Sequence, residues 1–535
     1  MKPAFPAFLV AGLLAGCALG PDYERPVTPT DDAYPEAGKG GVAIGAEWWK
    51  SFADPELDAL VAKAFAANTD LRQAVARVEQ AAAVLGEVEG AALPQVDANV
   101  TSQQIKISEG GFNPNLALNG RVRTNQRAAL STAFELDFWG RLRRAEEGAR
   151  AQLLQAEEGR RVVGLAVGAS VVRAYAWLRA AEVRAAAATE ILAAREAEVA
   201  LVARRIRVGA AGPAEVAAAE VFRAEAVARR ASARRTRAQA EHLLGALTGQ
   251  PALVIAPRAG DALRVPAPVA AGLPSDLLRH RPDVLAAEQA LVAANARIGF
   301  VKASRFPTFS LTAALGTESP DLESLFGPRN STSALGLGMQ LPLFDAGRGA
   351  ARVDAAVAVR NQAAAAYEQS VLNAFREVRD ALVDVRETAA AASAAERRAR
   401  AAREAFRVAE ARQGAGQAGP AELLVARRDQ AESLAAVAEV RLERITARWT
   451  SSVLWAAPGR MSRVSVRRRW RLPSRVGRFW FGHAHDARSL AATRGGRPAG
   501  RFPAGGQRRV RTRHPACVLR AAFRPGRPQV GGGPS

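Results

Sequence analysis

The sequence predicts an α+β protein in which short amphipathic strands alternate with very long helices. Three observations carry this prediction: two long proline-free stretches, short segments whose apolar residues recur at every second position, and the repetition of both within one chain. Helical and strand periodicity in separate segments argue for separate elements, against one continuous coiled coil. At 535 residues the chain can bury a large core or several smaller ones.

An internal two-fold repeat gives the chain two similar halves of roughly 210 residues. TDLRQAVARVEQAAAVLGEVEGAALPQVDANV (69–100) recurs as PDVLAAEQALVAANARIGFVKASRFPTFSLTA (282–313), which places Asp70 against Asp283 and Pro94 against Pro307. FELDFWGRLRRA matches QLPLFDAGRGAA, and RVGAAGPAEV matches QGAGQAGPAEL. Each half should therefore hold the same elements in the same order.

The sequence of each half predicts two strands. The first begins at Leu93-Pro94 or Phe306-Pro307, and the second follows a polar loop. Apolar residues at every second position give the second strand one apolar face. They are Leu130, Phe134, Leu136 and Phe138 in the first half, and Leu335, Leu337, Met339, Leu341 and Leu343 in the second. The small or polar residues Gly336, Gly338 and Gln340 between them suit a wet lumen.

Two very long helices are also predicted. Residues 140–208 contain no proline and would form about 100 Å of helix at about 1.5 Å per residue. A second such stretch covers residues 346–413, and each ends at a Gly-Pro turn before a shorter returning helix. Within the first stretch Val163, Val167, Val171, Ala174 and Leu178 recur at helical spacing, which predicts close antiparallel packing.

The N-terminus predicts an exported lipoprotein. MKPAFPAFLVAGLLAGCALG has a basic start, an apolar run and small residues before a cut, so residues 1–16 form a secretory signal peptide. Its LAGC end matches a lipobox, in which Cys17 carries a diacylglycerol and an N-acyl lipid. The alternative is an ordinary signal peptide in which Cys17 is incidental. A lipid tethers the chain without spanning the bilayer, and Ala18 after the cysteine favours the outer membrane.

Beyond the signal peptide no run of 18 apolar residues occurs, so a helical membrane span is not expected. Alternating strands can still form a barrel, but a spanning sheet must be closed to satisfy its backbone. Four strands per chain cannot close, and three copies would supply twelve. The predicted fold class is therefore an α+β membrane protein whose β-barrel closes only when several copies assemble.

The charge distribution argues against a nucleic-acid-binding coiled coil, the rival from another functional class. Residues 449–535 hold 19 arginines, no lysine and one acid, and so carry +18 of the net charge of +22. This Arg-rich tail lacks helical periodicity. A shifted reading frame near codons 445–455 is the favoured hypothesis, which re-sequencing of the gene tests. The alternative is a disordered basic extension that touches anionic lipid.

No catalytic or metal site is predicted. His242 and His280 have no neighbouring ligand residues, and the chain has neither a phosphate-binding loop nor an HExxH motif. Acid pairs such as Glu146-Glu147 lie among arginines and predict pairing on a wet helix face. No enzyme activity is expected, and no cofactor besides the lipid at Cys17.

Taken together, the motifs resemble the outer-membrane factor family, specifically its lipoprotein branch in resistance–nodulation–division efflux systems. The resemblance covers about residues 17–448 and rests on LAGC, EWWKSFADPELDALVAKAFAANTDLRQA, ELDFWGRLRR, RHRPDVLAAEQALVAANARIGFVKASRFPTFSLTAALG and LPLFDAGR. It implies a homotrimer with a 12-stranded outer-membrane barrel, an α-helical barrel across the periplasm and a mixed equatorial domain. The implied partners are a periplasmic adaptor (membrane fusion protein), an inner-membrane proton-driven pump and outer-membrane lipid, with no nucleic acid.

The resemblance also implies site residues. LLVARR (423–428) matches the family's periplasmic gate motif, with Arg428 at the gating arginine, Leu424 in the same run and Val425 where an aspartate is common. An acidic ring at the constriction is therefore not expected. The helix tips that meet the adaptor match Gly209, Gly212, Gly416 and Gly419. For Gly209 and Gly416 the bland alternative is a helix C-cap. The implied function is a passive exit duct of a tripartite efflux pump; the alternative is a duct for type I protein secretion.

The predicted organisation has five parts. They are the signal peptide (1–16), an N-terminal linker and equatorial segment (17–68), a first efflux repeat (69–262), a second efflux repeat (263–448) and the Arg-rich tail (449–535). Residues 46–74 predict a turn and a helix. Asp54 should cap that helix ahead of Pro55, with Leu57, Leu60, Val61 and Ala64 on one face.

Overall fold

The computed structural model describes residues 18–27, 47–106, 108, 122–258, 263–267 and 280–455, with side chains described up to residue 448. Two features singled out by the sequence, Cys17 and the Arg-rich tail beyond residue 455, lie outside the described residues. The proposals made for them therefore stay predictions.

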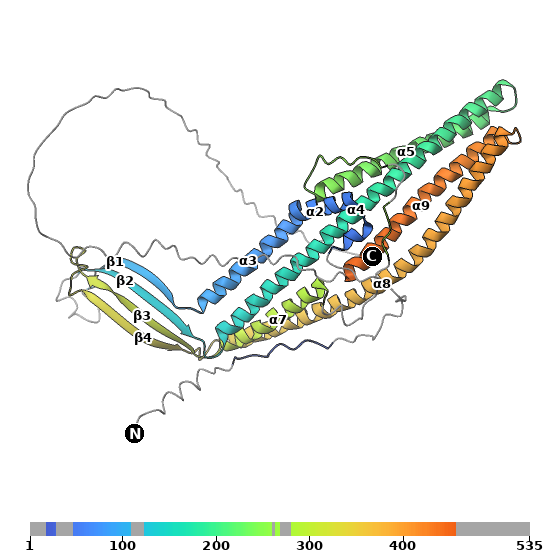
Figure 1. The fold of residues 1–535 in the computed structure, drawn as a ribbon. Helices are drawn as coiled ribbons and strands as arrows, with labels where there is room; N and C mark the ends of the chain where they lie inside the picture. The colour runs from blue at the N-terminus through green and yellow to red at the C-terminus, as the bar shows by residue number, and fades with distance from the viewer. Residues whose placement is uncertain are drawn as a thin grey trace, which may run out of the picture. The chain divides into compact units, whose positions relative to one another are not determined.

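The described elements follow an order that occurs twice (Figure 1). The first series is α3 (Thr69–Ala91), β1 (Gln95–Lys106), β2 (Val122–Leu136), α4 (Arg141–Arg207) and α5 (Pro213–Leu247). The second is α7 (Pro282–Ala303), β3 (Thr308–Ser319), β4 (Ser331–Gln340), α8 (Arg348–Gly414) and α9 (Pro420–Trp455). The short elements η1 (Trp48–Phe52) and α2 (Pro55–Ala67) precede both. This is the order predicted for each half.

The two long helices, α4 and α8, have 67 residues each and begin and end within two residues of the predicted bounds. Each follows a glycine with a positive φ, Gly140 at 75° and Gly347 at 83°, a backbone region that favours glycine. At about 1.5 Å per residue each helix is about 100 Å long. The strands and the helical hairpin tips therefore lie at opposite ends of α4 and α8 (Figure 1).

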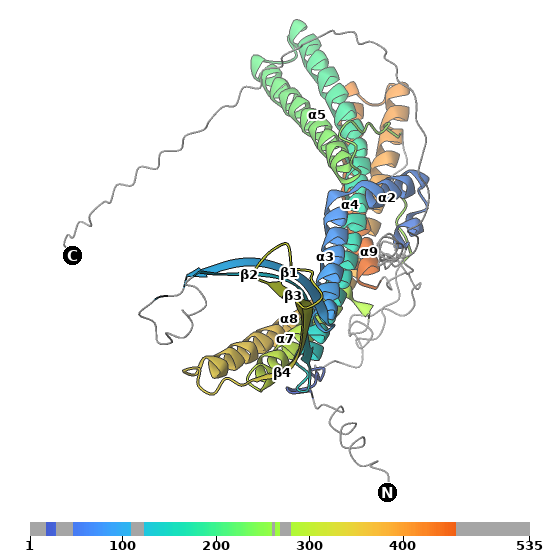
Figure 2. The ribbon, with the colours of Figure 1, turned by 90° about the vertical axis from the view of Figure 1, so that its left-hand side faces the viewer.

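Helix α4 is the centre of the helical packing. It contacts α3, α5, α7 and α9, and α8 contacts α7 and α9; Figure 2 shows α3 running alongside α4. Of the five predicted apolar positions on α4, Val167, Val171, Ala174 and Leu178 are buried, and Val163 is half-buried. Many of its other buried residues are alanines, whose small side chains let neighbouring helices approach closely.

By composition α4 and α7 are each long and apolar enough to cross a membrane. Neither helix is expected to span a membrane from its sequence, because its apolar residues are not continuous. Other parts of the chain bury 56% of the most apolar window of α4 and 50% of that of α7. Such burial is usual for core helices of soluble proteins.

The largest core lies where η1 and α2 pack against the middle of α4 and the end of α5. Tyr175, Leu178, Phe52, Val61 and Leu244 are each at most 1% exposed there. The predicted cap is confirmed: Asp54 Oδ1 accepts hydrogen bonds from the amides of Glu56 and Leu57. The predicted helix over residues 46–74 is instead divided at Asn68, whose side chain caps α3 through the amides of Asp70 and Leu71.

The four strands form one antiparallel sheet in the order β1-β2-β3-β4. Both halves contribute to it, because β2 of the first half pairs with β3 of the second. The strand predictions ran too far at three positions, since Phe138, Leu341 and Leu343 lie just beyond the strand ends. Phe138 instead packs edge-on against Phe309, with 5.2 Å between ring centroids.

Candidate functional site

The sheet has one apolar face and one polar face. On the apolar face Leu311 pairs with both Phe134 and Leu337, and Leu130 pairs with Leu315. These side chains have little cover within the chain: Leu335, on the same face, is 80% exposed. An apolar sheet face with this exposure requires an apolar environment or a protein partner.

The polar face carries small and charged side chains. Asn99 Nδ2 donates to Ser131 Oγ at 2.8 Å, and Asn125 Nδ2 donates to Glu318 Oε1 at 2.9 Å. The predicted lumen residues Gly336 and Gly338 lie on this face, opposite Thr312 and Ser310. This division between the faces is the arrangement of a membrane strand with lipid on one side and water on the other.

Contacts at the ends of the strands tie the sheet to the helices. Arg141 at the start of α4 donates from Nε and Nη2 to the two carboxylate oxygens of Glu135, at 2.8 and 2.5 Å. Trp139 Nε1 donates to the carbonyl of Pro307 at 2.8 Å and so joins the two halves. The geometry of the sheet is thus coupled directly to the long helix.

Residues 18–27, here called the strap, bind across both halves beside the sheet. The Leu19 amide donates to the Trp139 carbonyl at 3.0 Å. Arg144 of α4 donates to Asp22 at 2.7 Å, and Arg25 of the strap donates from Nε to Glu288 of α7 at 2.7 Å. The side chains of Arg144 and Glu288 are each only 7% exposed. The strap therefore supplies partners to one buried cation and one buried anion.

Glycines let the strap approach the helices. A Cβ on Gly299 of α7 would stand 2.6 Å from the Leu19 carbonyl oxygen, and one on Gly140 would stand 2.8 Å from the Ala18 Cα. Gly20 itself has a φ of +105°. Because Cys17 precedes the strap by one peptide bond, the predicted lipid site is attached to a segment that is packed in place.

The four predicted tip glycines lie in the two hairpin turns. Gly209 and Gly416 have φ values of +72° and +71°, and no atom lies within 4 Å of a Cβ built on any of the four. The residue after Gly209 and the residue after Gly416 each close the turn with a backbone hydrogen bond. The Ala210 amide donates to the Arg205 carbonyl, and the Gln417 amide donates to the Arg412 carbonyl. Gly209 and Gly416 therefore do form left-handed C-caps, on open turns that a partner can reach.

The two tips carry matching ion pairs. Arg205 on α4 contacts Glu215 on α5 at 3.2 Å, and Arg412 on α8 contacts Glu422 on α9 at 2.6 Å. Because both members of each pair are about half exposed, each pair adds little stability. Each pair instead places one positive and one negative side chain close to its hairpin turn.

The predicted gate residues lie near the start of α9. Arg428 Nη1 donates to Glu198 on α4 at 3.2 Å, and the two side chains are 15% and 31% exposed. Val425, one turn earlier, is 44% exposed, and Leu424 is half-buried. The structure thus joins the predicted gate arginine to an acid that the sequence reasoning had not identified.

Glu198 belongs to a series of ion pairs between the two helical hairpins. Along α9, Arg427 contacts Glu190 at 2.6 Å, Glu432 contacts Arg229 at 3.6 Å and Glu439 contacts Arg184 at 3.7 Å. This series was not predicted, because it joins charges far apart in the sequence, whereas helical spacing indicates only pairs within one helix. The surplus arginines of the gate motif were the only available signal.

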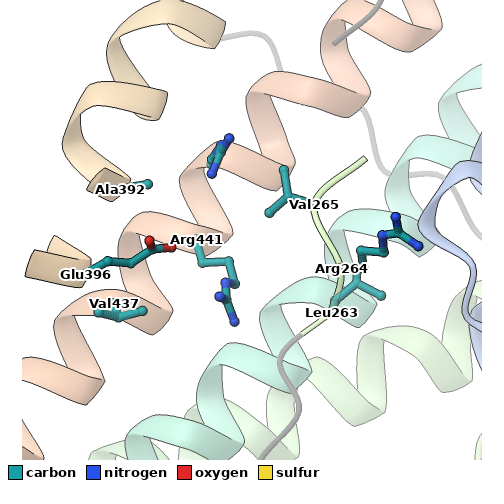
Figure 3. Close-up of a pocket in the computed structure, with 8 residues that line it drawn as sticks. Leu263, Arg264, Val265, Ala392, Glu396, Val437 and Arg441 are labelled. Atoms are coloured by element: carbon teal, nitrogen blue, oxygen red, sulfur yellow. The ribbon is translucent and has the colours of Figure 1, made fainter. Parts of the chain in front are cut away.

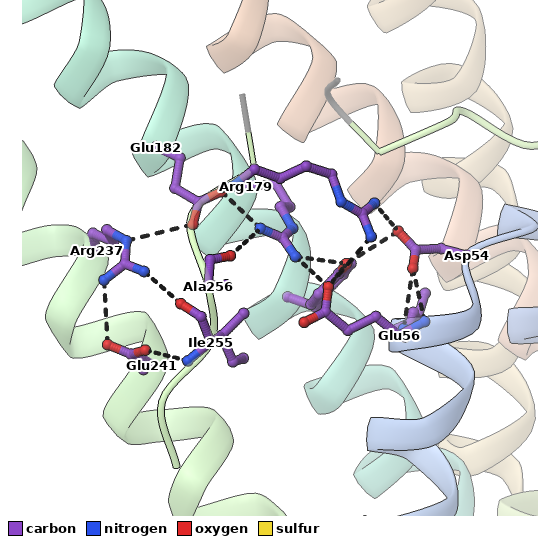
Figure 4. Close-up of polar contacts among 11 residues, drawn as sticks. Asp54, Glu56, Arg179, Glu182, Arg237, Glu241, Ile255 and Ala256 are labelled. Carbon is purple, nitrogen blue, oxygen red and sulfur yellow. Dashed lines mark hydrogen bonds and ion pairs between the residues drawn. The ribbon is translucent and has the colours of Figure 1, made fainter. Parts of the chain in front are cut away.

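A polar network fixes the core region (Figure 4). Tyr175 and Arg258 each contact Asp54 Oδ2 at 3.0 Å, and Arg179 contacts Glu56 and, at 2.8 Å, Glu182. A second arm fixes the chain after α5: the Ile255 carbonyl accepts from Arg237 at 2.7 Å, and the Ile255 amide donates to Glu241 at 2.6 Å.

This network is structural in character. Its acids are neutralised by arginines, and no group of three or more His, Cys, Asp and Glu side chains suited to a metal ion occurs in the described part of the chain. His242 and His280 are both exposed. The candidate functional features are instead the two-faced sheet, the strap, the open tips and the Arg428–Glu198 contact.

These features define a class: a membrane channel protein that combines a two-faced sheet with long helical hairpins. The family described as "Outer membrane efflux protein" matches residues 60–250 and 273–450. The chain belongs to this family, and it is an outer-membrane efflux channel. The two matched stretches correspond to the two series of elements.

Relatives of known name agree. "Cation efflux system protein CusC" of Escherichia coli (strain K12) is 31% identical over 385 residues, which cover 70% of this chain and 82% of that protein. "Outer membrane protein OprJ" of Pseudomonas aeruginosa is 35% identical over 394 residues, covering 71% and 81%.

Solved structures show the same fold. The open state of the MtrE outer membrane channel of Neisseria gonorrhoeae has a TM-score of 0.73 at 29% identity and covers 83% of this chain and 99% of that one. The outer-membrane channel OprN has a TM-score of 0.74 at 28% identity, with coverage of 82% and 99%.

Proposed function

We propose that three copies of this chain assemble into one passive exit duct, with a 12-stranded barrel in the outer membrane and a helical barrel in the periplasm. The observation that carries this proposal is the open, two-faced sheet. Within the described residues, no strand pairs with the outer edge of β1 or of β4. In hydrocarbon each unsatisfied backbone group costs several kcal/mol, so these edges must be paired.

Pairing between copies solves this problem. β1 of one copy and β4 of the next would pair, and three such pairings close twelve strands into a ring. The strands of 10 to 15 residues are long enough to span, since about 9–11 tilted residues suffice. The apolar face of Leu130 and Leu315 would then meet lipid, and the polar face of Asn99 and Ser131 would line water.

The proposed partners are a periplasmic adaptor, which meets the open tips at Gly209, Gly212, Gly416 and Gly419, and an inner-membrane pump. Relatives are named as outer-membrane parts of pumps, such as the "Toluene efflux pump outer membrane protein TtgF" of Pseudomonas putida, 33% identical over 397 residues. In this proposal the pump selects the substrate and supplies the energy, and the chain itself catalyses nothing. These names favour efflux over type I protein secretion.

The proposed lipid anchor is Cys17, which would carry a diacylglycerol and an N-acyl chain and insert them into the outer membrane. Support comes from the LAGC motif and from the strap, which begins at the next residue and packs beside the strands. A single lipidated residue gives limited anchoring alone, so lipid and barrel would act together.

The proposed periplasmic gate is the start of α9, where Arg428 holds α9 to α4 through Glu198. Leu424 and Val425 would narrow the opening with apolar side chains instead of an acidic ring. A pair with this exposure is worth about 1 kcal/mol, which corresponds to about a fivefold change in an open–closed ratio.

Conductance across planar lipid bilayers tests both the duct and the gate. The purified lipoprotein should insert and give brief openings, and Arg428→Ala should raise the open fraction about fivefold because the α4–α9 contact is lost. Arg407→Ala is the control, since Arg407 pairs with Glu404 within α8 on an exposed surface. Equal open fractions for wild type and Arg428→Ala would refute the gate, and no conductance from either would refute the duct.

A further inference from the structure

A basic cavity lies between α8, α9 and the short segment 263–267 that follows α5 (Figure 3). Its volume is about 370 Å³. The charged side chains that line it are Arg264, Arg441 and Arg444, with Glu396 as the acid. Neither the proposed gate nor the proposed adaptor contacts use these residues.

Within the described part of the chain, no acidic side chain balances the positive charge of the cavity. Among the described residues, none of the three lining arginines forms an ion pair, and Glu396 lies beyond ion-pair distance of them. Nearer the start of the same helix, Arg427 and Arg428 each contact a glutamate on α4. The excess of positive charge is therefore a property of this site and not of α9 as a whole.

One donor in the cavity wall is buried without a partner. Arg444 Nε is buried and makes no hydrogen bond, although such a donor normally finds an acceptor. Arg448, one turn farther along α9, is 5% exposed, and burial together with the charge of Arg444 lowers its pKa. A negative charge in the cavity would relieve the repulsion between Arg444 and Arg448.

The wall of the cavity is preformed. Leu263 is 5% exposed and belongs to the main core, and Val265 and Leu442 pack against that core. These contacts fix the backbone on both sides of Arg264 and next to Arg441. A charged site on such rigid elements binds without a large ordering cost.

We propose that this cavity binds a small oxyanion with at least two negative charges, of the phosphate or polycarboxylate type. A guanidinium presents a planar fork of donors that matches two oxygens of either group. The volume lies at the lower end of the range for small-ligand pockets, so the ligand is small. The bound anion joins segment 263–267 to α9, the helix that carries Arg428.

The test is isothermal titration of the full-length lipoprotein in detergent at constant ionic strength, with pyrophosphate and citrate as probes. Saturable binding of at least one probe is expected. Arg441→Gln and Arg444→Gln should each weaken it about tenfold, because each removes one charged fork. Glu396→Gln should tighten binding, because it removes the one opposing charge. This gain distinguishes a ligand site from a structural role, since a misfolded variant would only lose affinity.

Arg407→Gln is the matched control, because it removes the same charge from an exposed surface of α8. Equal weakening by Arg407→Gln and Arg441→Gln would show that general surface charge, and not a site, holds the probes, and would overturn the proposal. So would the absence of saturable binding. If dissociated chains bound pyrophosphate and intact oligomers did not, a carboxylate of a neighbouring copy would be the occupant, and the proposal of a free anion would be wrong.

Discussion

Glu288 lies on α7 with 7% of its side chain exposed, and its carboxylate accepts hydrogen bonds from Tyr23 and Arg25 of the strap. Arg144 on α4 is equally buried and contacts Asp22 of the strap and Glu147 on its own helix. Removing one partner of a buried charge costs more than the pair contributes, because the other charge stays buried. The strap is therefore part of the folded structure, and its position depends on individual contacts such as those of Glu288 and Arg144.

Gly299→Ala should displace the strap. Its methyl group would stand 2.6 Å from the Leu19 carbonyl and 2.9 Å from Arg144 Cγ, and the carbonyl belongs to rigid backbone. Residues 18–27 should then become sensitive to proteases under conditions in which the wild-type strap is protected. Limited proteolysis followed by mass spectrometry measures this.

Gly86→Ala is the control for that experiment, because Gly86 lies within α3 and no atom is within 4 Å of a Cβ built there. It should leave the strap protected and stabilise α3 by up to about 1 kcal/mol through helix propensity. If Gly299→Ala also left the strap protected, the close approach of the strap to α7 would be refuted.

At the scale of elements, α2 is held by its first residues. Burial alone raises the pKa of Asp54, but the hydrogen bonds from the Leu57 amide and Tyr175, with the charge of Arg258, bring its pKa below the ordinary value. A carboxyl group with a lowered pKa contributes stability above its unfolded pKa, near 4, and loses it as the pH falls through the folded value. The attachment of α2 to α4 should weaken in acid.

Asp54→Asn should lower stability at pH 7 by about 1–2 kcal/mol, because the cap acceptor remains while the charged contacts to Tyr175 and Arg258 are lost. The difference from wild type should shrink below about pH 4. Thermal unfolding followed by circular dichroism at pH 7 and pH 3.5 measures it. A difference that is the same at both pH values would contradict the assigned role of the Asp54 charge.

Asp58→Asn serves as the control within the same helix. Burial raises the pKa of Asp58, so its charge opposes folding at neutral pH. Its removal should therefore leave the stability at pH 7 unchanged or slightly higher.

The sequence alone predicts the elements well and their partners poorly. Periodicity and Gly-Pro turns placed both 67-residue helices, and Asp54-Pro55 placed the start of α2, because these signals are local. The break at Asn68 was missed, since the apolar pattern continues across it and only the cap shows it. The strap contacts and the Arg428–Glu198 pair join residues more than 100 positions apart, and charge type alone does not identify such partners.

At the scale of the whole molecule, strands from both halves form one sheet, and helices from both halves pack against one another. β2 pairs with β3, and α4 packs against α7 and α9. The outer edges of β1 and β4 have no partner strand among the described residues. The match to the family ends at residue 450, in the region where the sequence predicts a change of reading frame.

In the proposed assembly, copies of this chain close one barrel through β1 and β4. Disulfide cross-linking tests it most directly, in a chain with Cys517→Ser and with Thr101→Cys in β1 combined in turn with Thr332→Cys or Ala334→Cys in β4. All three positions lie on the polar face of the sheet. Oxidation in outer membranes should give a ladder on denaturing gels that stops at three chains. A single cysteine should give none, and a chain whose β1 and β4 never cross-link, or whose ladder passes three, would contradict the trimeric barrel.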